Sequence, residues 1–122
     1  MGSKRVILKR WDRIEYVLNW ACEYYDMDRS ELKVSYKKRS KTDRKKIIIK
    51  LLREVADCSF EDITTAIGLE GVVAVWLNYQ DINENISTNT PYGRELKKTY
   101  NEIVKILLND ENTNEKISKK TA

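Results

Sequence analysis

The densest group of chemically active side chains is a run of cations between Tyr36 and Lys46. Seven of these eleven residues are positive and one is negative, so the segment carries a local charge of +6. Because the whole chain carries +4, the other 111 residues sum to −2. Clustered cations bind phosphates, and a helix that begins here would add free backbone N–H donors. The segment indicates either a phosphate-binding surface or a solvated charged run, and its candidate phosphate contacts are Lys37, Lys38, Arg39, Lys41, Arg44, Lys45 and Lys46.

The sequence offers little for catalysis or for holding a metal. It has no histidine, which is the commonest general base and the commonest zinc ligand. No nucleophile-elbow motif, phosphate loop or paired-carboxylate motif is present. Cys22 and Cys58 lie far apart, each within an apolar helical pattern, and both are interpreted as small core residues. We therefore expect a protein that is not an enzyme, without metal, cofactor or small-molecule substrate, although acids, lysines and tyrosines leave enzymatic chemistry open.

Length and composition favour one small domain. The chain has 122 residues, of which 41% are hydrophobic and 34% are charged, and its isoelectric point is near 9.0. No run of 18 apolar residues predicts a membrane span, and the apolar stretch in residues 1–8 is too short for a signal peptide. We expect a cytoplasmic protein. Residues 1–8 are predicted to be an extension, 9–109 the domain, and 110–122 a polar, disordered tail.

Apolar periodicity predicts helices throughout. The first helix is expected from about 9 to 26, and a capping-box pattern at Asp28–Glu31 predicts a short helix that carries Leu32. Thr42 is expected to cap the next helix, which has an apolar stripe of Ile47, Ile48, Leu51, Leu52 and Val55. Thr90 and Pro91 predict the cap and first residue of the last helix. The expected fold is all-α, a small bundle of about six helices.

Two of these helices have the spacing of a helix-turn-helix. Ser59 is expected to cap a helix of about two turns, which ends at Gly68. A longer helix is expected from about Glu70 to Ile86. A short helix, a glycine turn and a longer helix are typical of DNA-binding helix-turn-helix proteins, but they also occur in many helical bundles.

Together with the basic segment, the order of these features resembles the C-terminal DNA-binding domain, domain IV, of the bacterial replication initiator DnaA, in the Trp-repressor-like superfamily. The resemblance covers Trp20–Ile82 without a gap. "ACEYYDMDRSEL" looks like the first core helix of that family, and "KKRSKTDRKKIIIKLLREV" looks like its basic loop and next helix. "SFEDITTAIG" is similar to the family's Ser-Leu-x-x-Ile-Gly-x-x-Phe-Gly segment at Ser59, Ile63 and Gly68. The resemblance implies an all-α fold that binds double-stranded DNA.

The chain departs from the family where DNA bases would be read. The family continues with Gly-Arg-Asp-His-Thr-Thr-Val, whereas this chain has Leu69-Glu70-Gly71-Val72-Val73-Ala74-Val75. Glu70 stands where the resemblance implies an arginine, and apolar side chains replace hydrogen-bonding ones. Each lost bidentate pair removes about 1–3 kcal/mol of base discrimination. Lys45, with Arg44 beside it, falls at the position of the family's minor-groove arginine.

Helical spacing divides this second helix into two faces. Val72, Val75, Trp76 and Tyr79 are expected to pack inward, while Val73, Ala74 and Leu77 turn outward. The tryptophans and tyrosines are expected mostly in the core, with Tyr36 as the exception that stays open.

Three functions remain. In the first, the chain binds double-stranded DNA, mainly through the basic loop, with weak or altered sequence specificity. Alternatively, it docks to a protein, either a second copy of itself or a replication or regulatory protein. The third alternative is an enzyme or another function unrelated to DNA. The candidate residues of the recognition-helix face are Glu70, Val73, Ala74 and Leu77.

Overall fold

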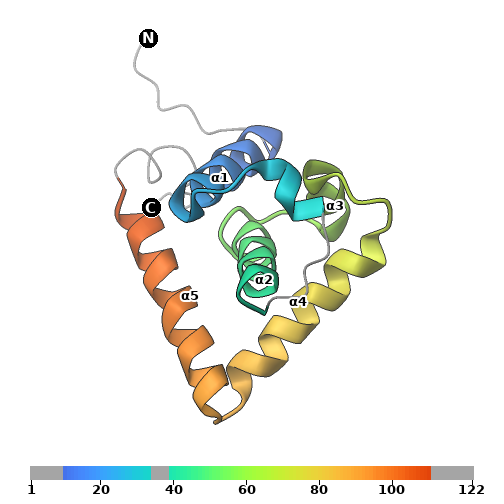
Figure 1. Ribbon diagram of the computed structural model, residues 1–122. Helices are drawn as coiled ribbons and strands as arrows, with labels where there is room; N and C mark the ends of the chain where they lie inside the picture. Colours follow the sequence, from blue (N-terminus) through green and yellow to red (C-terminus); the bar gives the residue numbers. More distant parts are fainter. Residues whose placement is uncertain (1–9, 34–38, 111–122) are drawn as a thin grey trace.

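The structure, a computed structural model, describes residues 10–33 and 39–110, with the backbone alone at 10, 11 and 39–41 (Figure 1). These residues form helices and connecting turns, without a strand. The expected all-α fold is confirmed, and the expected six helices correspond to five α-helices and one 3-10 helix. The elements are α1 (Arg10–Tyr25), η1 (Arg29–Lys33), α2 (Arg39–Glu54), α3 (Phe60–Ile67), α4 (Val72–Ser87) and α5 (Pro91–Asn109). Most of the expected extension and tail, 1–9 and 111–122, lies outside the described residues.

The local signals for helix ends are largely confirmed. Ser59 caps α3, because its hydroxyl accepts from the backbone N–H of Asp62 at 3.0 Å. Gly68 ends α3 in the left-handed conformation, with a φ of 93°. Thr90 caps α5 by accepting from the N–H of Gly93, and proline follows at the start of the helix.

Two predicted helix starts are wrong. Helix α2 begins at Arg39, so Thr42 lies inside it and is not its cap. No glycine or proline separates Arg39 from Thr42, and arginine and lysine favour helix, so the helix extends through them. Helix α4 begins at Val72 and not at Glu70, because Gly71 before it is extended, with φ −131° and ψ 143°.

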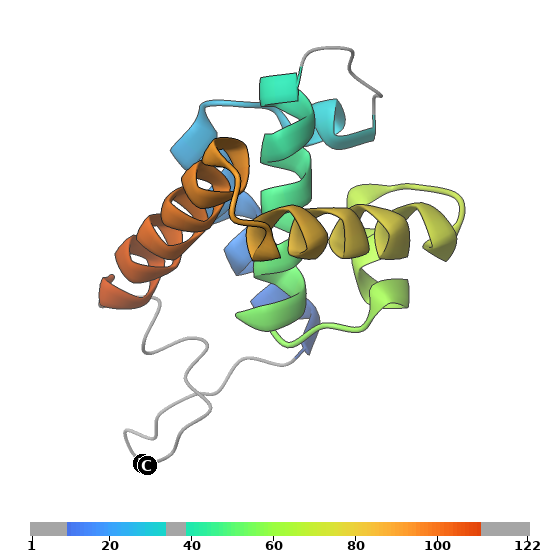
Figure 2. The same ribbon diagram turned by 90° about the horizontal axis from the view of Figure 1, so that it is seen from below.

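Helix α2 forms the centre of the molecule, and the other helices surround it (Figure 1). Its residues 47–52 are all buried, including Ile49 and Lys50, which lie outside the predicted apolar stripe. Helices α1, α3 and α4 all pack against α2, so its middle has no side left for solvent. Seen from below, α4 crosses over α2 (Figure 2).

A polar network around Lys50 ties α4 and α5 to the central helix. The ammonium donates to Glu54 Oε2 at 2.8 Å and to Asn83 Oδ1 at 2.5 Å. Glu54 also accepts from the hydroxyls of Tyr79 at 2.7 Å and Tyr100 at 3.1 Å. Burial works to raise the pKa of Glu54, but the hydrogen bonds from Lys50 and the tyrosines outweigh it and lower that pKa.

The corner between α4 and α5 is closed tightly around Gly93. A Cβ atom at Gly93 would lie 2.3 Å from the Asn85 carbonyl oxygen and 2.4 Å from Thr88 Oγ1. No side chain larger than hydrogen fits there without moving the backbone. The corner therefore requires glycine for close approach, since Gly93 has no positive φ.

We predict that Gly93→Ala destabilises the fold by about 1–3 kcal/mol, the usual effect of overpacking a tight site. Urea unfolding followed by circular dichroism measures this change. Gly71→Ser is the matched control, because a Cβ there meets no atom within 4 Å and serine supplies a capping hydroxyl. Equal stability losses in the two variants would contradict this account of the corner.

We predict that Glu54→Gln lowers the free energy of unfolding at neutral pH by about 1 kcal/mol, a modest value because the carboxylate is partly exposed. The pKa of Glu54 is lowered by folding, so its contribution is present above the unfolded value of about 4.3 and is lost as pH falls through the folded value. The gap between wild type and Glu54→Gln should therefore close in acid. Urea titrations across this range measure it, with the exposed Glu84→Gln as control. A gap that stays constant with pH would count against the network.

Candidate interaction surfaces

Helices α3 and α4, with the turn between them, form one packed unit. Phe60 of α3 meets Tyr79 of α4 with ring centroids 5.4 Å apart. The turn lies against the end of η1, since a Cβ on Gly68 would be 2.7 Å from Lys33 Cε. Lys33 at the end of η1 therefore borders this turn.

The outer face of α4 is apolar and larger than predicted. Val73 and Leu77 are 62% and 53% exposed, and Ala74 is also exposed, as expected. Val72 and Trp76 are 36% and 43% exposed, so the prediction that they pack inward is wrong. The first turns of α4 extend past α2 (Figure 2), and within them only Val75 is buried.

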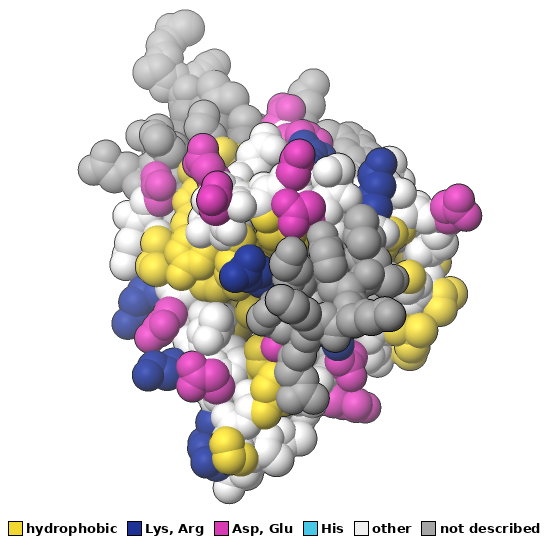
Figure 3. Space-filling model, viewed as in Figure 1, with side chains coloured by type: hydrophobic (Ala, Val, Ile, Leu, Met, Phe, Trp, Pro, Cys, Tyr) yellow, Lys and Arg dark blue, Asp and Glu magenta, His cyan; other side chains and the backbone are white. Residues whose placement is uncertain are grey.

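We call Val72, Val73, Ala74, Trp76 and Leu77 the α4 apolar face. Hydrophobic side chains gather over the first turns of α4 at the right edge of Figure 3. Four of the five follow the i, i+1, i+4, i+5 pattern of a single helix face. This spacing is visible in the sequence, but it does not say whether the face points toward the core.

The charge of the α3–α4 unit is unfavourable for DNA. Residues 57–86 contain six acids and no lysine or arginine, a local charge of −6. Glu70 is exposed immediately before α4, where the resemblance implies an arginine. Acidic side chains beside a phosphate backbone repel it. The acids are Asp57, Glu61, Asp62, Glu70, Asp81 and Glu84.

The described part of the basic segment is engaged with other elements. The Lys46 ammonium is bonded to the carboxylate of Asp81 on α4. The Arg44 guanidinium lies 5.2 Å from the ring centroid of Tyr25 on α1. Burial lowers the pKa of Lys45. Lys46, Arg44 and Lys45 therefore contribute to packing within the domain.

The remaining basic candidates are placed only in part. Arg39 and Lys41 lie in the first turns of α2, without described side chains. Lys37, Lys38 and Tyr36 fall outside the described residues.

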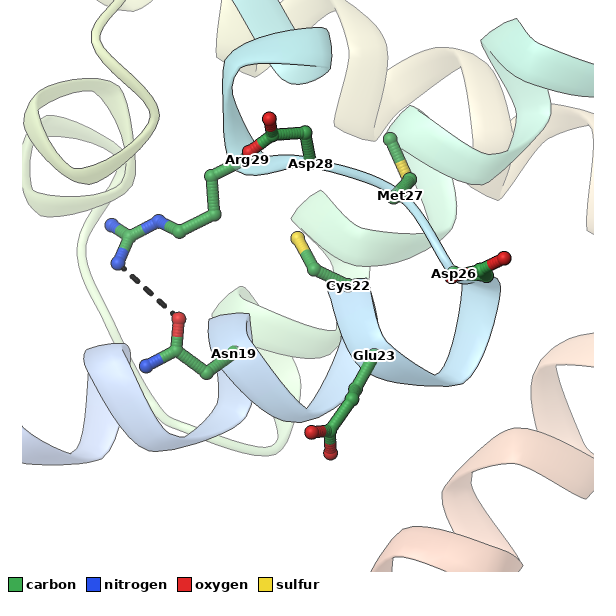
Figure 4. A pocket seen from close by; sticks show the side chains of 7 residues that line it. All are labelled: Asn19, Cys22, Glu23, Asp26, Met27, Asp28 and Arg29. Atoms are coloured by element: carbon green, nitrogen blue, oxygen red, sulfur yellow. Dashed lines mark hydrogen bonds between the residues drawn. The ribbon is translucent and has the colours of Figure 1, made fainter.

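A pocket of about 560 Å³ between α1 and η1 offers no convergent chemistry. Arg29 donates to Glu15 at 2.5 and 3.1 Å and to Asn19 at 3.4 Å, so it is committed to structure. Burial raises the pKa of Cys22, which makes its thiol less reactive. The acids that line the pocket point in different directions (Figure 4).

The described part of the chain contains neither a candidate metal site nor a disulfide. It contains no group of three or more potential ligands that could hold a metal ion. Cys22 and Cys58 are both buried and form no disulfide, as expected for small core residues.

Two further findings bear on identity. Among the described helices, none combines the length and apolar character needed to cross a membrane. No family model, curated protein or solved structure matches this chain.

Proposed function

We propose that this chain is a protein-interaction module that associates with a second copy of itself through the α4 apolar face. The observation that carries this proposal is the exposure of Val72, Val73, Trp76 and Leu77 on consecutive turns of one helix. Exposed apolar patches favour association, and tryptophan is prominent among residues that dominate binding energy. The polar, hydrogen-bonding side chains that read bases are absent from this face.

Charge favours a second copy as the partner. From Gly71 to Gln80 the chain has no charged residue, so a two-fold contact centred here would bring no like charges together. Along its sequence each copy carries both a −6 unit at 57–86 and a +6 segment at 36–46. Two copies therefore offer opposite charges to each other, and such charges steer association.

We predict that Val73→Lys weakens self-association at least about tenfold, because it places a charge in an apolar contact. Sedimentation equilibrium over a concentration series measures the effect. Ile106→Lys is the matched control, since Ile106 is an apolar side chain on α5 that is 48% exposed and lies outside the α4 apolar face.

Association should also shift the fluorescence of Trp76 to shorter wavelength, and Trp76→Phe should remove that shift. A chain that stays monomeric at every concentration, or equal effects of the two lysine variants, would overturn the proposal.

Duplex DNA is the second candidate partner, favoured by the +6 charge of eleven consecutive residues. Contacts from this segment would be to phosphates, and the apolar α4 face would contribute no hydrogen bonds to bases. Such binding is largely electrostatic and independent of sequence.

We predict that log K for any DNA binding falls steeply with log salt, by about 0.9 for each phosphate neutralised. Changing Arg39, Arg44 and Lys45 together to Ala should remove most of the affinity while the helical circular dichroism spectrum is kept. Fluorescence anisotropy with labelled duplexes measures both effects. The DnaA recognition sequence should bind no better than a scrambled duplex. A flat salt response, or a preference above about a hundredfold, would contradict this candidate.

A further inference from the structure

A surface pocket of about 500 Å³ lies at the corner where α4 meets α5. One wall is the outer face of α5, and the other is the end of α4 with the turn that follows it, residues 86–89. The α5 residues Arg94, Lys97, Lys98 and Asn101 follow the i, i+3, i+4, i+7 spacing of one helix face. All four of these side chains are exposed, so core packing does not account for this face.

The pocket is lined by three cations and no acid. Acidic side chains do alternate with lysines and arginines along the outer edge of α5 (Figure 3), but none of them lines the pocket. Among the described residues, Lys97 and Lys98 form no ion pair. Their positive charges face a shared hollow without an internal counter-ion, an arrangement that an anion would stabilise.

Arg94 is held in position for such an anion. Its Nη1 donates to the backbone oxygen of Asn89 at 3.1 Å and to the Asn89 side-chain oxygen at 2.9 Å. Its Nη2 and Nε form no hydrogen bond within the described structure. An arginine fixed on one side keeps its other donors free for an oxyanion, with less ordering on binding.

The end of α4 would otherwise repel an anion, since the last carbonyls of a helix are negative. Two of them are already bonded. The Glu84 carbonyl oxygen accepts from Ser87 Oγ at 2.8 Å, and the Asn85 carbonyl oxygen accepts from Thr88 Oγ1 at 2.7 Å. The pocket thus presents donors from α5 while these carbonyl groups are partly neutralised.

We propose that this pocket binds a phosphate group. Phosphate matches three cations and two asparagine amides, whereas no aromatic side chain lines the pocket to stack on a base. The site lies apart from the α4 apolar face and does not require self-association.

The test uses the whole chain and inorganic phosphate, titrated at constant ionic strength against chloride. We expect the backbone amide NMR signals of Asn89, Lys97 and Asn101 to shift with phosphate and not with chloride. Lys97→Gln with Lys98→Gln should weaken phosphate binding at least about tenfold, since each charged contact contributes more than a neutral one. Lys33→Gln with Lys105→Gln is the matched control, because it removes the same charge without touching the pocket. Circular dichroism verifies that both variants fold.

A duplex DNA titration then identifies the source of the phosphate. Shifts of the same signals with DNA assign the pocket to a phosphodiester backbone, and shifts with inorganic phosphate alone assign it to a small phosphorylated molecule. Either result supports the site. Absence of localised shifts, or an equal loss in the pocket and control variants, would overturn it.

Discussion

Lys50 places a positive charge in the middle of a helix that other helices cover on every side. A buried ammonium is costly unless it is paired and hydrogen-bonded, so the elements around it must supply acceptors. Glu54 supplies one from the same helix, and Asn83 supplies the other from α4. Tyr100 brings α5 to the same carboxylate. These contacts hold α4 and α5 against the central helix, with Val73 and Leu77 on the side of α4 that faces solvent.

Apolar surface and positive charge lie on different elements of the chain. Apolar surface is concentrated at the start of α4, and cations lie before and within α2 and on the outer face of α5. The α3–α4 unit carries six acids and no lysine or arginine between residues 57 and 86. A surface of this kind is better suited to contact with protein than with nucleic acid, while the proposed phosphate site lies on α5.

The sequence predicted the helices well because their signals are local. Ser59, Gly68, Thr90 and Pro91 act on their own neighbouring backbone groups, and each performs its expected role. Burial was harder to predict, since it depends on neighbours distant in the chain. The periodicity of α4 groups Val72 and Trp76 with Val75, but α3 covers too little of the first turns to bury them. Lys50 shows the opposite error, because a charged residue gives no sign of being buried. The pocket at Arg94, Lys97 and Lys98 combines two elements, and a reading of α5 alone shows only a solvated face.

Because the contact at Gly93 is tight, a change in packing there would tilt α4 about the corner between α4 and α5. Helix α4 extends from this corner for 16 residues, or about 24 Å, before it reaches its apolar tip. A tilt of about 5° at the corner would move that tip by about 2 Å, enough to disrupt a close-packed contact. The close contacts of Gly93 with Asn85 and Thr88 therefore bear on the position of the α4 apolar face, which lies at the other end of the helix.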